Sequence, residues 1–303
     1  MNNYNNSTIS IKVPKSKLLE VANSLEERFL GIRKLSLINE YEFARYFNKG
    51  TNVIFYKSGK VVISGYRNDD IVNFILEYSE IGSNVGEFKY LIGIDETGKG
   101  EIIGNIIICG VLIDSTKVDL KELEKLILGF DTKGKKKNFS KYQEVFERIT
   151  SLGVSYRIEE VKPKDIKPKK TNVVMLERVR NILDSFIGSL EDKSLTRIVI
   201  DDFGIKDKEE LKNRYDSKVV IEHKADDNYL ECKVASIISR YHREKFLDFI
   251  NSSGEYTLDG IKPLDGNLSN PNTIEWIRKW TEKNGKLPDF VKDWNIIRNK
   301  RLL

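Results

Sequence analysis

The chain has 303 residues, enough for about two domains at roughly 100–200 residues each. Hydrophobic residues make up 40% and charged residues 32%, which excludes a disordered chain. No apolar run approaches the ~18 residues of a membrane span, and the polar start MNNYNNS is unlike a signal peptide. Fifty-one Lys and Arg residues against 46 Asp and Glu residues give a net charge of +5, which is compatible with a polyanionic partner without requiring one.

Cysteine and histidine are scarce, with two of each: Cys109, Cys232, His223 and His242. This excludes a disulfide scaffold and argues against a zinc site built from Cys and His. We expect a cytoplasmic protein with no membrane association, in which both cysteines are small core residues and both histidines serve packing or face solvent.

The first part of the chain predicts a small α/β domain at about 1–86. We expect a strand that stops at Pro14, a helix, a β-hairpin that turns at Ser58-Gly59, and a second helix capped by Asp69 or Asp70. The segment GSNVG (82–86) is typical of a linker. The apolar residues that define these elements are Ile9, Ile11 and Val13, then Leu18, Leu19, Ala22, Leu25 and Phe29, then the run Val53–Gly65, then Ile71, Phe74, Ile75 and Tyr78.

From Lys89 onward, strands that are apolar throughout alternate with helices, which predicts one α/β domain over about 87–303. In the helix 140–152, Ser140 and Gln143 form a predicted capping box, and Asn270 and Gly285 bound the last helix. The predicted strands are 90–95, 105–113, 197–201 and 218–222, and the predicted helices are 120–128, 140–152, 172–190, 228–249 and 271–284.

Acidic residues gather where these strands end. Asp95 and Glu96 follow one strand, Asp201 and Asp202 end the next, and Asp226 and Asp227 follow the strand VVIE. Because α/β sheets place their sites at the carboxyl ends of strands, we expect the three clusters to converge. Oxygen ligands without Cys or His suit Mg²⁺ or Mn²⁺, and two such ions activate water in phosphodiester cleavage.

Two other interpretations compete for these residues. Gly93, Gly98 and Lys99 fit a phosphate-binding loop, but Gly100 stands where that loop needs Ser or Thr. Single Asp residues at strand ends and helix starts are also common as solvated caps. A regular strand would put Asp95 and Glu96 on opposite faces, so the metal hypothesis expects a bend allowed by the following glycines.

Several blocks together resemble the type 2 ribonuclease H family. They are GIDETGKG (93–100), DTK (131–133), IVIDDFG (198–204) and KADDNYLECKVASIISRYHR (224–243), in the family's order and spacing. The first domain, with FYKSGKVVISG, resembles the substrate-binding domain of the ribonuclease HIII branch. The resemblance implies a ribonuclease H-like mixed sheet flanked by helices, preceded by a small domain like the TATA-binding protein.

The resemblance also implies a reaction and its residues. Asp95, Glu96, Asp201 and Asp226 would bind two Mg²⁺ or Mn²⁺ ions and hydrolyse the RNA strand of an RNA–DNA hybrid, leaving 5′-phosphate and 3′-hydroxyl ends. The segment of Gly98, Lys99 and Gly100 would approach the ribose 2′-hydroxyl, and Lys133 and Lys224 would contact phosphates. The resemblance further suggests a monomer without a small-molecule cofactor.

Two features leave the specificity open. The tail 269–294 is similar to archaeal type 2 enzymes, which favours removal of single embedded ribonucleotides. Asn267, however, stands where those enzymes carry a tyrosine that recognises the RNA–DNA junction, which favours cleavage within RNA tracts. A protein that binds hybrids without cleaving them is the alternative outside enzymes, although clustered carboxylates gain nothing for polyanion binding.

Overall fold

The computed structural model describes residues 6–66, 68–79, 85–128, 130, 139–167, 170–215 and 217–292. The chain folds into two compact units. One comprises Met1–Glu87 and Asp119–Lys133, and the other comprises Phe88–Val118 and Gly134–Leu303. No helix within the described ranges is long and apolar enough to cross a membrane.

The first unit is built on a five-stranded antiparallel sheet in the order β1-β5-β4-β3-β2. The predicted hairpin is confirmed as β4 and β5, which turn through Gly59 at φ +92°. Strands β2 and β3 were not predicted. In β3, buried residues alternate with half-buried ones along its whole length. The strands are β1 (Asn6–Lys12), β2 (Arg33–Leu35), β3 (Glu42–Asn48), β4 (Thr51–Tyr56) and β5 (Lys60–Tyr66).

Two helices cover one face of this sheet, α1 (Leu18–Arg28) after the short 3-10 helix Lys15–Lys17, and α2 (Asp69–Leu76). Their apolar sides pack on the inward residues of the strands, so the alternate strand residues form a second face. Two details differ from the prediction. Asn68, not Asp69 or Asp70, caps α2, because its side chain accepts a hydrogen bond from the backbone of Ile71 at 3.2 Å. Leu19 is 62% exposed, since it points away from the sheet.

A third helix of this unit comes from much later in the chain. This is α4, with the predicted bounds Leu120–Leu128, and Leu128 packs against the same hydrophobic core. The hydroxyl of Ser79 also donates a hydrogen bond to the buried carboxylate of Glu124. The chain therefore leaves this unit, forms two strands of the other, and returns.

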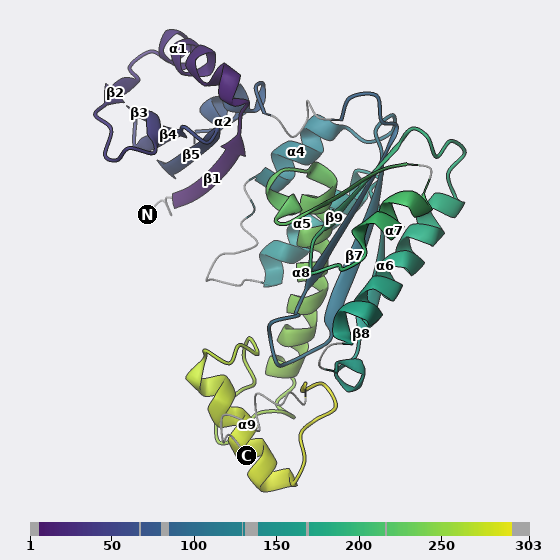
Figure 1. Ribbon diagram of the computed structural model, residues 1–303. Helices are drawn as coiled ribbons and strands as arrows, with labels where there is room; N and C mark the ends of the chain where they lie inside the picture. Colours follow the sequence, from purple (N-terminus) through teal and green to yellow (C-terminus); the bar gives the residue numbers. More distant parts are fainter. Residues whose placement is uncertain are drawn as a thin grey trace. The chain divides into compact units, whose positions relative to one another are not determined.

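The second unit contains a mixed five-stranded sheet in the order β10-β9-β6-β7-β8, which confirms the predicted fold class (Figure 1). Strands β10, β9 and β6 are parallel, whereas β7 and β8 run antiparallel to their neighbours. The edge strand β8 was not predicted, because most of its residues are polar and exposed. The strands are β6 (Tyr90–Thr97), β7 (Ile106–Asp114), β8 (Ser155–Val161), β9 (Thr196–Asp201) and β10 (Lys218–Glu222).

Helices lie on both faces of this sheet. Hydrophobic residues of α6 pack on one face, and α8 packs on β6 and β7 from the other, with α5 against α8 (Figure 1). The predicted capping box is wrong in detail, because α5 begins at Phe139 and therefore includes Ser140. The helices are α5 (Phe139–Ser151), α6 (Thr171–Gly188), α7 (Lys208–Arg214), α8 (Leu230–Ser252) and α9 (Pro271–Asn284), with 3-10 turns at Pro163–Asp165 and Ala225–Asp227.

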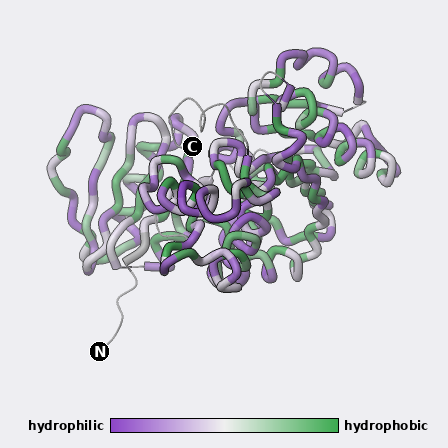
Figure 2. Tube along the Cα trace, turned by 90° about the horizontal axis from the view of Figure 1, so that it is seen from below, coloured by the Kyte–Doolittle hydropathy of each residue, from purple (hydrophilic) through white to green (hydrophobic). Residues whose placement is uncertain are grey.

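A separate hydrophobic cluster joins α9 to the end of α8. Trp276 is fully buried there, and its indole nitrogen donates to the carbonyl of Tyr256 at 2.6 Å. The predicted ends of α9 are confirmed, with Asn270 as N-cap and Gly285 at φ +70° as C-cap. Green hydrophobic stretches alternate with purple polar ones along the chain, as these two-faced elements require (Figure 2).

Two glycines set how closely the helices approach the sheet. A Cβ atom on Gly93 of β6 would lie 2.2 Å from the backbone of Glu231, in the first turn of α8. A Cβ atom on Gly110 of β7 would lie 2.2 Å from the side chain of Ile182 in α6. Since Gly93 meets backbone rather than a movable side chain, any larger residue there must displace α8.

We therefore expect Gly93→Ala to lower the free energy of unfolding by about 3 kcal/mol or more, because the methyl group overlaps the first turn of α8. Urea denaturation of the full chain measures this. The control is Gly188→Ala in α6, where a Cβ atom meets nothing within 4 Å and stability should stay the same or rise. Equal stability of the two variants would contradict the close contact.

Candidate active site

The carboxyl ends of the parallel strands bring the predicted acids together. Ile94 of β6 pairs with Ile200 of β9, so Asp95 and Asp201 are the next residues at the same edge of the sheet. Asp201 also pairs with Glu222, the last residue of β10. The expected convergence of strand-end acids is therefore present in the backbone register.

Asp95 and Asp201 also point to the same face, the one covered by α8. Gly93 touches the backbone of α8, and Asp95 stands two residues further along β6, hence on the same side. Val199 packs with Cys232 of α8, and Asp201 follows it by two residues. Both carboxylates therefore lie under the first turns of this helix, and Asp95 is only 7% exposed.

The two members of the Asp201-Asp202 doublet have different environments. The carboxylate of Asp202 interacts with the loop that follows it. It accepts hydrogen bonds from the backbone N–H groups of Gly204 and Ile205, each at 2.9 Å, and forms an ion pair with Lys208 at 2.5 Å. Despite partial burial, these donors hold the pKa of Asp202 below its usual value. Asp201 accepts from the backbone of Ala225 at 2.9 Å.

Asp226 reaches the same region from the 3-10 turn Ala225–Asp227, which leads into α8. Asp226 is 6% exposed, whereas Asp227 is exposed. Lys224 caps this turn in the left-handed conformation, at φ +58°, and its side chain is exposed. The left-handed turn directs the N–H of Ala225 toward Asp201, so it connects the two acids.

The raised pKa values of Asp95, Glu96 and Asp201 show that burial and neighbouring acids act on these carboxylates. Burial, followed by the charges of Glu96, Asp201 and Asp226, raises the pKa of Asp95 well above its usual value. Burial also raises the pKa of Glu96, which Lys99 opposes, and burial raises the pKa of Asp201, with Asp226 adding to it. Buried carboxylates that repel one another destabilise a fold unless a cation compensates them.

These carboxylates fit hard divalent cations such as Mg²⁺ and Mn²⁺ in the chemistry of their donor atoms. Throughout the described ranges, however, no three Asp, Glu, His or Cys side chains form a ready metal-binding group. The acids thus meet as a cluster of negative charge and not as a closed ligand cage.

The glycine-rich turn follows β6 directly. The bend that the following glycines were expected to allow does not reach the acids, since β6 stays in register with β7 through Thr97 and the chain turns only at Gly98, with φ +90°. Asp95 and Glu96 therefore lie on opposite sides of the strand. Lys99 reaches across to donate to the carbonyl of Phe203 at 2.6 Å. Among the described residues, the backbone N–H groups of Lys99 and Gly100 have no hydrogen-bond partner.

One predicted site residue cannot be placed. Lys133, predicted to contact phosphate, lies outside the described residues. Cys109 and Cys232 are fully buried, which confirms them as core residues, and His223 is exposed.

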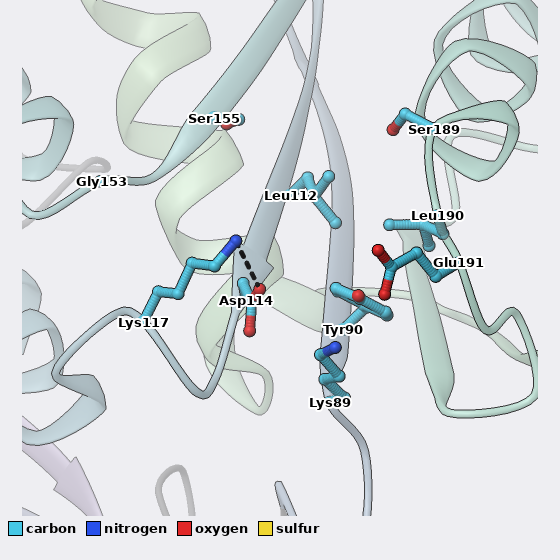
Figure 3. A pocket seen from close by; sticks show the side chains of 10 residues that line it. All are labelled: Lys89, Tyr90, Leu112, Asp114, Lys117, Gly153, Ser155, Ser189, Leu190 and Glu191. Atoms are coloured by element: carbon cyan, nitrogen blue, oxygen red, sulfur yellow. Dashed lines mark ion pairs between the residues drawn. The ribbon is translucent and has the colours of Figure 1, made fainter.

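A polar pocket of about 410 Å³ lies at the opposite end of β6 from the acids (Figure 3). Its wall includes Tyr90, which pairs with Asp114 at the start of β6, and the ion pair of Asp114 with Lys117 at 3.4 Å. None of the predicted site residues lines it. The acids and the pocket are therefore separate features of the sheet.

His242, the other histidine expected to pack or to face solvent, lies in an aromatic cluster of α5, β8 and α8. Its ring lies 5.2–5.8 Å from those of Tyr241, Phe146 and Tyr156. Its Nε2 is buried and has no hydrogen-bond partner among the described residues. Burial and Lys245 lower the pKa of His242, opposed by Glu160. This is the environment of a structural histidine.

Comparison with known proteins identifies the class of this fold. The ribonuclease H2 of Pyrococcus horikoshii OT3 superimposes on this chain with a TM-score of 0.55 at 24% identity. The superposition covers 70% of this chain and 98% of that protein. The Bst-RNase HIII structure, determined in complex with Mn²⁺, superimposes over 98% of both chains, with a TM-score of 0.57 at 15% identity. The fold is that of the type 2 ribonucleases H, and the second superposition includes the first unit.

The sequence comparisons then fix the family. The sequence model of ribonuclease HII matches residues 92–295. The ribonuclease HII of Thermococcus sibiricus is 28% identical over 216 residues, which cover 68% of this chain and 88% of that protein. The chain belongs to the ribonuclease HII family and is a ribonuclease H endonuclease.

The half-buried His242, with its buried Nε2, predicts how the stability of the protein depends on pH. Because the folded protein favours neutral His242, its contribution to stability is complete above pH 6.5 and decreases as the pH falls through that value. In His242→Phe, which cannot be protonated, thermal unfolding should lose less stability between pH 7.5 and pH 5.5 than in the wild type. The same pH dependence in both proteins would show that His242 is not buried as described.

Proposed function

We propose that this protein hydrolyses the RNA strand of RNA–DNA hybrids at the acidic cluster of Asp95, Glu96, Asp201 and Asp226. The observation that carries the proposal is the meeting of three separate strand-end acids under α8, where burial and mutual repulsion raise the pKa of Asp95. A site that only bound a polyanion would be weakened by such a cluster. The alternative of a hybrid-binding protein without catalysis is therefore disfavoured.

The four carboxylates would bind two Mg²⁺ or Mn²⁺ ions when the hybrid is present. When bound, such ions activate the attacking water and stabilise the leaving oxygen, giving 5′-phosphate and 3′-hydroxyl ends. Asp201 rather than Asp202 is assigned to this role, because the carboxylate of Asp202 is occupied by Lys208 and two backbone donors. Asp226 is assigned over Asp227 because it is buried beside the other acids.

The substrate would be recognised by the turn of Gly98, Lys99 and Gly100. The available N–H groups of Lys99 and Gly100 suit the oxygen of a ribose 2′-hydroxyl, the group that separates RNA from DNA. Lys224, exposed beside Asp226, would contact a phosphate, and we retain the same role for Lys133.

The first unit would supply a second surface for the hybrid. The strand face not covered by α1 and α2 carries Arg33 packed on Phe47, with 5.5 Å between the guanidinium and the ring centre, beside Asn52 on the next strand. Aromatic rings, guanidinium groups and amides are typical of nucleic-acid contacts. This unit and the full-length superposition on an RNase HIII support the HIII branch.

Cleavage within RNA tracts is the specificity that we propose. Asn267 takes the place of the junction-reading tyrosine, and its side chain is used within its own loop, where it accepts from the backbone and hydroxyl of Ser269, each at 2.9 Å. Removal of single embedded ribonucleotides is the alternative, suggested by the archaeal-like tail. We further propose that the protein acts as a monomer.

Asp201→Asn tests the acidic cluster. We expect kcat on a labelled RNA–DNA hybrid to fall by about 100-fold or more, while the hybrid Kd changes by less than about threefold, because the change removes a cation ligand and no contact with nucleic acid. Gel-based cleavage with Mg²⁺ or Mn²⁺, and binding without either ion, measure the two effects.

Asp202→Asn is the matched control. It removes a neighbouring negative charge and the pair with Lys208, so it should lower stability yet retain most of the activity. Similar activity of the two variants would remove Asp201 from the site. Absence of cleavage by the wild type with either ion would contradict the proposed function itself.

Asn52→Glu tests the strand face of the first unit. A negative charge there should repel phosphates and raise the hybrid Kd by about three- to tenfold at low salt, with little change in kcat. Asn23→Glu on the exposed side of α1 makes the same substitution on the helical face and should leave Kd unchanged. Equal effects of the two variants on Kd would show that the strand face does not bind the hybrid.

A further inference from the structure

A buried lysine from the end of the chain lies beneath the glycine-rich turn. Lys292 has no exposed surface, and its Nζ donates to the carbonyl of Gly98 and, at 2.7 Å, to that of Glu101. The segment that carries it is held in place, because the N–H of Lys292 donates to the carbonyl of Ile102 at 2.8 Å and Val291 bridges to Ile103. The fixed backbone therefore aims the ammonium group at the turn.

A second buried cation supports the same loop from α8. Arg243 donates to the carbonyls of Ile103, at 2.9 Å, and Asp265, at 3.0 Å, and lies 3.7 Å from the carboxylate of Glu101. Burial and the charge of Arg243 lower the pKa of Lys292 to about 7. Burying a charged side chain here costs more free energy than burying an apolar one of similar size. What Lys292 contributes in return is the pair of hydrogen bonds that hold the two backbone carbonyls.

The carbonyl of Gly98 determines where the next peptide N–H of the turn points. In a planar trans peptide the C=O and N–H groups point in opposite directions. Because the carbonyl of Gly98 points toward Lys292, the N–H of Lys99 points away from it, on the outer side of the turn. Lys99 itself fastens the turn on the other side through the carbonyl of Phe203.

We propose that Lys292 is a positioning residue for substrate recognition: by holding the carbonyls of Gly98 and Glu101, it fixes the Gly98–Lys99 peptide so that the turn presents its N–H groups to the ribose 2′-hydroxyl. This inference rests on the proposed function and names a residue outside the acidic cluster and the turn. Lys292 touches neither substrate nor cation in this role, and it acts through the backbone that it holds.

The test compares Lys292→Met with the wild-type full chain on an all-ribose RNA–DNA hybrid and on hybrids in which single 2′-hydroxyls near the cleaved bond are replaced by fluorine. Methionine fills the space without donating hydrogen bonds. We expect kcat/KM on the all-ribose hybrid to fall by about tenfold, mainly through KM, and the selectivity for the 2′-hydroxyl to fall by a similar factor. Lys292→Arg keeps two donors and should restore both.

Thr273→Val is the control for simple destabilisation. Thr273 is buried near the start of α9, and its hydroxyl donates to the carbonyl of Pro263 at 3.1 Å and not to the turn. Its selectivity should equal that of the wild type. If Lys292→Met keeps the wild-type selectivity, or changes KM no more than Thr273→Val does, the inference is wrong.

A second variant and measurement replace Lys292→Met if that variant does not fold. If Lys292→Met fails to fold, NMR relaxation of the Lys99 and Gly100 amides in Lys292→Gln decides: more backbone motion than in Thr273→Val supports the role, and unchanged motion overturns it. If the wild type cleaves hybrids with selectivity for the 2′-hydroxyl and Lys292→Met is equally selective, only this inference is refuted. Lack of any hybrid cleavage by the wild type refutes the proposed function instead.

Discussion

The close contact of α8 with β6 at Gly93 determines most of the site. Because the two backbones touch there, Asp95 two residues later must lie beneath the helix, and the turn that precedes α8 brings Asp226 to the same place. Glu231, in the first turn of α8, forms a buried pair with Arg197 of β9 at 2.8 Å, which ties the helix to the neighbouring strand as well. The approach of a single helix to two parallel strands thus sets the positions of three acids from separate parts of the sequence.

The acidic residues at and near this end of the sheet divide into two groups. Asp202 and Glu231 have cationic partners and backbone donors, so their charges are compensated within the fold. Within the described part of the chain, Asp95 and Asp201 have no cationic partner of this kind, and the charges of neighbouring acids add to burial in raising their pKa values. Adjacent residues such as Asp201 and Asp202 can therefore differ in role, and the partners of each side chain separate the structural carboxylate from the one proposed to be functional.

The sequence predicted the central strands of the second unit well, because β6, β7 and β9 are apolar throughout and end in polar turns. It failed for β8, whose polar residues resemble a loop, and for β3, where burial alternates but hydrophobicity does not, since Glu42 and Asn48 are buried while Phe43 and Phe47 are half-buried. The acids were predicted as strand-end residues, but their common face depends on tertiary packing. Lys292 could not be predicted, since 194 residues separate it from Gly98.

The return of α4 to the first unit has a consequence for folding during synthesis. The core around Leu128 and the bond between Ser79 and Glu124 cannot form until the ribosome has passed β6 and β7. Those two strands are apolar on both faces and must wait longer still, for β9 and α8, before they are covered. Two incomplete hydrophobic surfaces therefore coexist on the nascent chain, and this is the stage at which a chaperone would be of most use.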